Sequence, residues 1–221
     1  MFVTLGEEIM LLSLDDGSGK ARERMTAGWV VAGAFLLDLA LAGRITAEDG
    51  RLRVVDAAPT GVPLLDGRLA AVAAWTEGRR TAKVAAWVTK DQSTAVRAAI
   101  DSLRERGLVT EERHRLLGLF PVRRYPEADG SVERELRARL TAAVLDGAEP
   151  DERTTGLIAL LHGARLHRLA FPDLRRRQVE PRMAAIAEGQ WAGEAVRQAI
   201  RTMQAAMVAV ATTTAIAASS G

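Results

Sequence analysis

Apolar residues recur along most of this chain with the period of an α-helix. Residues 25–43 are apolar on nearly every side, which predicts a central buried helix that ends at Gly43. In residues 131–146 apolar side chains return at every fourth position and form one face of an amphipathic helix: Val132, Leu136, Leu140 and Val144. Further helices are predicted over residues 62–75, 81–88 and 93–106, and three or four over 153–218, with breaks near Pro172 and Gly189.

Two segments have the pattern of β-hairpins rather than helices. Residues 44–56 contain two short strand-like runs around Asp49-Gly50, which is a strong signal for a tight turn. Residues 108–126 form two extended arms around a Leu116-Leu117-Gly118 tip. The whole pattern therefore predicts a mainly α fold, a single compact helical domain over residues 1–221 with two or more protruding β-hairpins.

The beginning of the chain predicts a helix followed by a turn. Thr4 and Glu7 have the spacing of a capping box, and the adjacent Glu7 and Glu8 are expected to be surface carboxylates in the first helical turn. The run at residues 15–20, Asp-Asp-Gly-Ser-Gly-Lys, is similar to a phosphate-binding loop only in its Gly-Lys pair. Such a loop needs a Gly where this chain has Leu14, and a Ser or Thr where it has Ala21. We therefore expect a turn rather than a nucleotide site.

Composition narrows the classes of chemistry that are open to this chain. The sequence contains no Cys, which excludes disulfides and Cys-based metal sites, and its His residues lack the spacing of a zinc site. No Gly-x-Ser-x-Gly motif is present, so we expect no enzymatic activity, no cofactor and no metal. The N-terminus has no signal segment, and residues 202–221 are uncharged but rich in Ala and Thr rather than Leu and Ile. These features predict a cytoplasmic protein whose last helix is buried or faces another subunit.

Arginine is concentrated in two stretches of a chain whose net charge is only +2. Residues 97–124 hold seven Arg against four acidic residues, and residues 165–182 hold six against two. Basic stretches beside an apolar tip suit an anionic surface, either phospholipid headgroups or nucleic acid. We expect weak, peripheral membrane binding through these arginines and through the apolar tip of the second hairpin. The tip and the uncharged last helix would also support homo-oligomers. The tip residues are Leu116, Leu117, Leu119 and Phe120.

Residues 93–125 also have the order of a winged helix, a helix followed by a two-stranded arm, which makes DNA binding an alternative hypothesis. On that hypothesis the helix would expose Ala95, Ala98 and Ala99, where a recognition helix needs polar residues that read bases. The tip of the arm is apolar, whereas a wing that contacts phosphates should be polar. Nucleic acid is therefore the less favoured partner, and the exposed face of residues 93–106 distinguishes the two hypotheses.

Five stretches of the chain carry a more specific signal. They are TLGEEIMLLSLDDGSGK, FLLDLALAGRI, APTGVPLLD at residues 58–66, LRERGLVTEERHRLLGLF, and GLIALLHGARLHRLAF at residues 156–171. Together, and in this order, they resemble the Golgi phosphoprotein 3 family over nearly the whole chain. The resemblance implies a largely helical domain with protruding hairpins that acts as a non-enzymatic, cytosolic, peripheral membrane adaptor. The many Ala, Gly and Arg residues suggest a GC-rich genome and hence a bacterial member.

The resemblance also implies ligands. Eukaryotic members of the family bind phosphatidylinositol 4-phosphate and the cytoplasmic tails of Golgi glycosyltransferases, and their hairpin serves self-association and membrane contact. Their headgroup pocket uses a Trp and three Arg, and the corresponding positions here are Glu23, Ala32, Ser93 and Val96. A carboxylate at Glu23 would repel a phosphate. Arginines lie one residue away from these positions, and they are the candidate headgroup-binding residues: Arg22, Arg24 and Arg97. The resemblance thus implies an anionic phospholipid surface and an unidentified protein partner, without fixing which lipid is bound.

Overall fold

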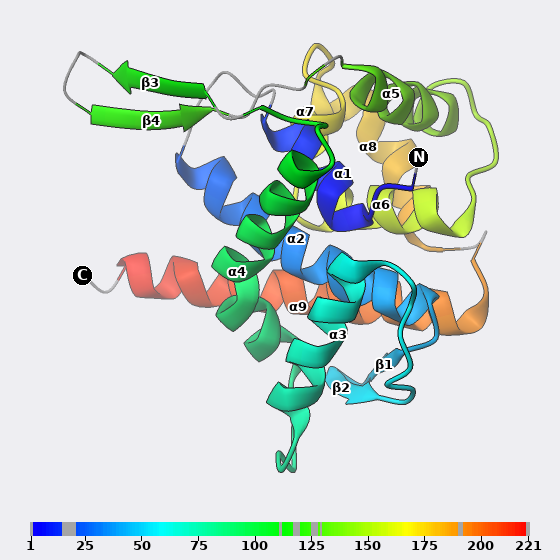
Figure 1. The fold of residues 1–221 in the computed structure, drawn as a ribbon. Helices are drawn as coiled ribbons and strands as arrows, with labels where there is room; N and C mark the ends of the chain where they lie inside the picture. Colours follow the sequence, from blue (N-terminus) through cyan, green and yellow to red (C-terminus); the bar gives the residue numbers. More distant parts are fainter. Residues whose placement is uncertain are drawn as a thin grey trace.

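The computed structural model is mainly helical and describes residues 2–14, 21–110, 112–116, 120–124, 128, 130–189 and 192–219. For residues 21–27, 112–116, 120–124, 195, 211 and 213–219 it describes the backbone alone. In chain order the elements are α1 (Leu5–Leu14), α2 (Ala21–Leu41), β1 (Ile45–Glu48), β2 (Arg51–Val54), α3 (Pro63–Thr76), α4 (Val84–Glu105), β3 (Glu112–Leu116), β4 (Phe120–Arg124), α5 (Ser131–Val144), α6 (Glu152–Gly163), α7 (His167–Ala170), α8 (Arg176–Ala187) and α9 (Glu194–Ser219). The predicted mainly α fold with two β-hairpins is confirmed (Figure 1).

Helix α2 forms the centre of the fold, as the apolar pattern of residues 25–43 predicts. It contacts α1, α4, α6 and α9, and Val30, Phe35 and Leu37 within it have almost no solvent exposure. Gly43 follows the end of the helix with a φ of +69°, a left-handed conformation that stops helices and favours glycine. One hydrophobic core includes residues from every helix between α1 and α9, so the helices are packed around α2 rather than divided between separate cores.

Helix α4 is one continuous helix, and the prediction of two helices over residues 81–88 and 93–106 is wrong. The polar run between them, which includes Asp91 and Gln92, does not interrupt the helix because Asp91 is buried and paired with Arg68 of α3. A stripe of apolar residues continues through the whole helix, and Ala95 and Ala99 in it are both 0% exposed. The expectation that these two alanines face solvent is therefore also wrong.

The two hairpins differ in their relation to the helices. In the first, Asp49 and Gly50 have φ values of +50° and +72°, as a two-residue type I′ turn requires. This hairpin lies against the body rather than protruding, because Ala47 and Leu52 face the core and Thr202 Oγ1 of α9 donates to the Ala47 carbonyl at 2.6 Å. In the second, β3 and β4 pair in antiparallel register and extend away from the helices (Figure 1).

The last third of the chain follows the sequence pattern closely. Helix α5 buries Leu136, Leu140 and Val144 of the predicted amphipathic face. The chain then forms α6, α7, α8 and α9, with the interruptions near Pro172 and Gly189 where they are predicted. Gly189 has a φ of +73°, so a left-handed residue ends the segment that precedes α9.

Candidate functional site

Three elements project on the same side of the molecule, which we call the hairpin side. They are the β3–β4 hairpin, the beginning of α2 and the end of α9, all on the left in Figure 1. The candidate headgroup residues and the described tip residues Leu116 and Phe120 lie on these elements and on the neighbouring part of α4. The fold therefore brings to one side segments that are far apart in the sequence.

The candidate headgroup residues belong to the packed helix pair α2 and α4. A Cβ atom placed on Gly28 of α2 would lie 3.6 Å from the Val96 Cγ2 atom of α4, so the first turns of α2 run beside the middle of α4. Arg97, next to Val96, is exposed. The side chains of Arg22 and Arg24, and that of Glu23, lie outside the described residues.

The remaining family pocket positions have three different environments. Ala32 is 0% exposed and belongs to the core, Val96 is half-buried, and Ser93 is exposed on α4. A side chain in the position of Ala32 contacts the protein interior rather than a ligand. A pocket built as the family builds it therefore has no counterpart at this position.

The apolar tip is partly visible in the backbone. Leu116 and Phe120 are the last paired residues of the hairpin, while Leu117 and Leu119 lie outside the described residues. The register also pairs Arg113 with Arg123, two residues of like charge in directly opposite positions. The sequence alone does not reveal this pairing because it depends on the register of the strands.

Two arginines of the basic stretch at residues 165–182 are bound to other groups of the protein. The Arg182 guanidinium donates to the Ala143 carbonyl at 3.1 Å, and Arg176 pairs with Glu180 on the same helix. Arg168 and Arg177 are exposed. The structure thus leaves only part of the positive charge of this stretch available to a partner.

The expectation that Glu7 and Glu8 are surface carboxylates is wrong: they are 0% and 5% exposed. The capping box itself is present, since the Thr4 amide donates to Glu7 Oε2 at 2.8 Å and the Glu7 amide donates to Thr4 Oγ1 at 3.2 Å. Both side chains are buried because α1 is surrounded by other helices, so its first turn lies inside the protein.

These carboxylates are held by side chains from distant helices. Glu7 accepts from Ser102 Oγ at 2.7 Å and from Arg106 Nη1 at 3.0 Å. Glu8 pairs with Arg139 at 2.9 Å and with Arg153 at 3.3 Å. This polar cluster therefore fastens α1 to α4, α5 and α6.

Asp38 of α2 completes the polar cluster. It accepts from the Leu5 amide at 2.8 Å and from Arg153 Nη1 at 2.9 Å. Burial disfavours its charged form and raises the pKa of Asp38 to about 7, although the nearby Arg153 acts in the opposite direction. Each charged side chain of this cluster has at least one ion-pair partner from another helix, although Glu8 Oε2 and Arg139 Nε make no hydrogen bond, so the arrangement indicates a role in holding the fold together.

Two further observations concern metal binding and membrane crossing. In the described part of the chain, no three His, Asp or Glu side chains are grouped so that they could hold a metal ion. No helix among the described residues is both long and apolar enough to cross a lipid bilayer.

Comparison with known proteins identifies a family for this chain. No curated protein matches the chain. The family model described as Golgi phosphoprotein 3 (GPP34) matches residues 5–203, which include α1 through the first part of α9. The match thus covers the central helix, both hairpins and the polar cluster, and the chain belongs to the Golgi phosphoprotein 3 (GPP34) family.

Proposed function

We propose that this protein is a peripheral membrane adaptor that rests on anionic phospholipid with its hairpin side and holds a protein partner there. The observation that carries the proposal is the common direction of the β3–β4 hairpin, the beginning of α2 and the end of α9 (Figure 1). Three projections on one side offer several points of contact with a flat surface. Membership in a family of Golgi phosphoprotein adaptors supports the same function.

The charges on this side favour an anionic surface. Arg97 is exposed and has no carboxylate partner among the described side chains. The register pairs Arg113 with Arg123 and so brings two basic residues to opposite positions of the second hairpin. Each basic residue close to an anionic bilayer contributes about 1 kcal/mol, so a few arginines together give reversible binding.

The lipid that we propose is any accessible anionic phospholipid rather than one phosphoinositide. Ala32 is buried in the core, and Glu23 brings a negative charge to the position where the family has Trp. The family pocket depends on several charge-assisted hydrogen bonds to phosphate, each worth roughly 1.5–3 kcal/mol. Arg22, Arg24 and Arg97 would supply general attraction without that set of bonds.

We also propose that the hairpin tip and the end of α9 permit self-association. The tip is apolar in sequence, and in the middle of α9 the side chain of Val208 is largely exposed. Exposed apolar residues on projecting elements are typical of surfaces that contact another subunit or a bilayer interface.

DNA binding finds no support in the exposed face of α4. In residues 93–106 Ala95 and Ala99 pack inward and Ala98 is half-buried, and the exposed side chains include Asp101 and Glu105, whose carboxylates would face phosphates. Arg104 is 3.5 Å from Asp101, so part of the positive charge of this face is already paired. The exposed face thus carries carboxylates beside its basic and hydroxyl side chains, and these carboxylates disfavour close contact with a phosphate backbone.

The proposal is tested by co-sedimentation with vesicles of phosphatidylcholine alone, with added phosphatidylglycerol, or with added phosphatidylinositol 4-phosphate, at matched charge and two salt concentrations. The wild-type protein should bind both anionic vesicles to a similar extent and lose binding as salt rises. Selective binding to the phosphoinositide would show that the arginines rebuild a headgroup pocket and would overturn the proposed lipid preference.

Substitutions on the hairpin side test whether this side contacts the membrane. Arg97→Glu and the double variant Leu117→Asp/Leu119→Asp should each reduce sedimentation with anionic vesicles, and the double variant should also reduce oligomer size by light scattering. Arg177→Glu changes an exposed arginine on α8, away from the hairpin side, and serves as the matched control. Equal binding by all four proteins would remove the hairpin side as the membrane contact.

A further inference from the structure

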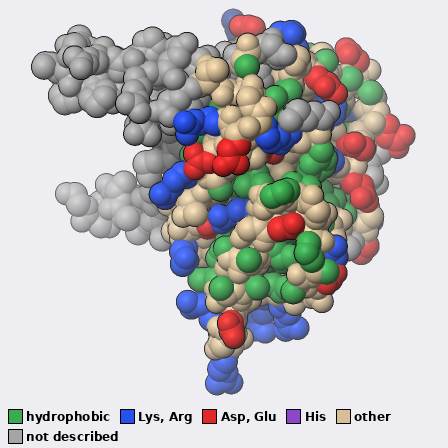
Figure 2. Space-filling view, in the orientation of Figure 1, with side chains coloured by type: hydrophobic (Ala, Val, Ile, Leu, Met, Phe, Trp, Pro, Cys, Tyr) green, Lys and Arg blue, Asp and Glu red, His purple; other side chains and the backbone are tan. Residues whose placement is uncertain are grey.

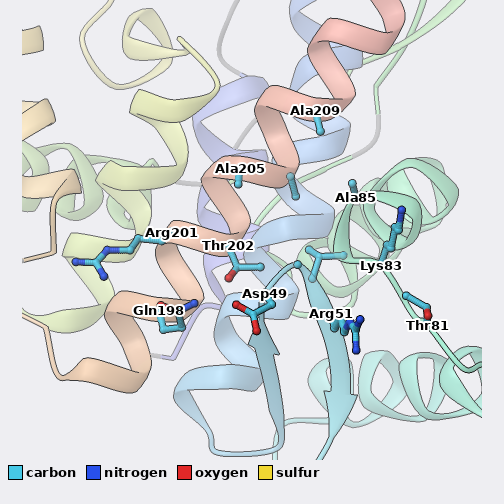
Figure 3. Close-up of a pocket in the computed structure, with 13 residues that line it drawn as sticks. Asp49, Arg51, Thr81, Lys83, Ala85, Gln198, Arg201, Thr202, Ala205 and Ala209 are labelled. Carbon is cyan, nitrogen blue, oxygen red and sulfur yellow. The ribbon is translucent and has the colours of Figure 1, made fainter.

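A cleft of about 600 Å³ lies between the turn of the β1–β2 hairpin, the beginning of α4 and the middle of α9 (Figure 3). Its size is that of an ordinary ligand site. No pattern in the sequence marks it, because its lining comes from three separate segments. The lining residues are Asp49, Gly50 and Arg51 of the hairpin; Thr81, Lys83, Val84 and Ala85 at the start of α4; and Gln198, Arg201, Thr202, Ala205, Ala206 and Ala209 of α9.

The walls of the cleft are joined to one another by hydrogen bonds. The Val84 amide donates to the Gly50 carbonyl at 2.9 Å and the Leu52 amide donates to the Ala82 carbonyl at 2.7 Å, which fixes the hairpin to the start of α4. On the other side, the hydroxyl of Thr202 fixes the hairpin to α9 through the carbonyl of Ala47. The cleft is therefore preformed, which reduces the entropic cost of binding a ligand.

The lining combines small apolar side chains with separated positive charges. Valine and alanine side chains from α4 and α9 leave the cleft open where larger residues would fill it. Arg51, Lys83 and Arg201 are exposed, and none has a carboxylate partner among the described side chains. Asp49 is the acidic residue of the lining, so positive charge exceeds negative charge by two.

The positions of the three cations indicate the shape of the ligand. Arg51 and Lys83 lie on the hairpin and at the start of α4, whereas Arg201 lies at the outer edge of α9 with its side chain directed away from them (Figure 3). A single phosphate group needs donors that converge on one point, and these do not. A flat bilayer could contact the edges but not the apolar lining between them. A ligand that uses all three cations would have to be extended, with anionic groups toward both ends.

We propose that this cleft binds an acidic peptide segment of a partner protein. Carboxylates toward its two ends would pair with Arg201 on one side and with Arg51 and Lys83 on the other. Small apolar side chains between them would contact the alanines, because a carboxylate in the middle would meet Asp49. The inference rests on the proposed adaptor function and specifies the chemistry of its partner.

The location of the cleft is compatible with simultaneous membrane contact. The β1–β2 hairpin lies at the opposite end of the molecule from β3–β4 (Figure 1). Lys and Arg side chains gather at this lower end (Figure 2), where Arg79 and Arg80 in the α3–α4 connection are also exposed. A positive surface around the cleft would accelerate the association of an acidic segment.

The test is to select short random peptides displayed on phage against the full-length protein without vesicles, and to measure the enriched peptides by fluorescence anisotropy. The expected binders are rich in Asp and Glu on both sides of a small apolar centre. The double variant Arg51→Glu/Lys83→Glu should bind these peptides with an affinity that is lower by roughly tenfold or more. Ala205→Phe keeps every charge but fills the cleft, and it should weaken binding to a similar extent.

The control Arg168→Glu/Arg177→Glu makes the same charge change on exposed arginines elsewhere and should bind as the wild type does. Thermal unfolding of each variant excludes loss of fold as the cause. Enrichment without acidic bias, or equal affinity in the Arg51 and Lys83 variant, would overturn the proposal. The proposal would also be overturned if the wild type bound no acidic peptide and the Arg51 and Lys83 variant lost vesicle binding. The cleft would then be a membrane contact. Failure of membrane binding alone would refute the proposed membrane contact and leave this result unaffected.

Discussion

At the scale of single residues, the buried carboxylates of α1 are expected to be sensitive to substitution. Glu7→Ala should lower the free energy of unfolding by roughly 3–5 kcal/mol, because it leaves Arg106 and Ser102 without their buried acceptor. Urea denaturation followed by circular dichroism measures the change. Glu105→Ala removes an exposed carboxylate of α4 and should change stability by no more than about 0.5 kcal/mol. Similar losses in both variants would contradict a structural role of the polar cluster.

Asp38 should make stability depend on pH. Its pKa is raised from 3.8 to about 7 in the folded protein, so between these values the folded state binds more protons than the unfolded state. The contribution of Asp38 to stability is therefore full below about pH 4, falls as pH rises to about 7 and is constant above. Asp38→Asn removes this titration. Between about pH 4 and pH 7 the free energy of unfolding of the wild type should fall relative to that of the variant. Urea denaturation at several pH values measures this difference. If the two proteins show the same dependence of stability on pH, Asp38 stays ionised.

At the scale of elements, close helix packing depends on a few glycines. A Cβ atom on Gly6 of α1 would lie 2.6 Å from the buried Phe35 ring, and two more ring atoms lie within 2.9 Å. Gly6→Ala should therefore destabilise the protein by about 1–3 kcal/mol. Gly67 lies in α3 with no such neighbour within 4 Å, so Gly67→Ala should stabilise it by about 0.5–1 kcal/mol. Melting temperatures test both signs, and a stabilised Gly6→Ala variant would mean that Phe35 moves aside.

The elements are also where the sequence is most informative. Apolar periodicity predicts the central helix, and Asp49-Gly50 predicts the first hairpin, because both depend on local residue types. The interruption predicted between residues 88 and 93 is absent because Asp91 finds a buried partner on α3, a contact that local pattern cannot reveal. The same reason applies to Glu7: its capping role is local and predictable, whereas Arg106 lies 99 residues away in the sequence.

At the scale of the whole molecule, candidate sites arise from segments that meet only in the fold. The sequence predicts an apolar tip and arginines, but not that the β3–β4 hairpin, the beginning of α2 and the end of α9 share one side. It gives no indication of the cleft, since Arg51, Lys83 and Arg201 look like ordinary surface residues until the hairpin is fixed against α4 and α9. Placement, rather than residue type, therefore distinguishes the two surfaces.

Because the second hairpin extends away from the helices, we expect that it can be removed without loss of the fold. The Ala128 amide donates to the Leu108 carbonyl at 2.9 Å, so the two ends of the excised segment are already close together. Replacing residues 111–126 by a short Gly-Ser linker should leave the free energy of unfolding within about 0.5 kcal/mol of the wild-type value. Vesicle binding should fall sharply, whereas acidic peptide binding at the cleft should persist, because the cleft lies at the other end of the molecule. Unfolding of the excised protein would mean that the hairpin belongs to the core. Loss of both binding activities from a folded protein would mean that the two surfaces are not independent.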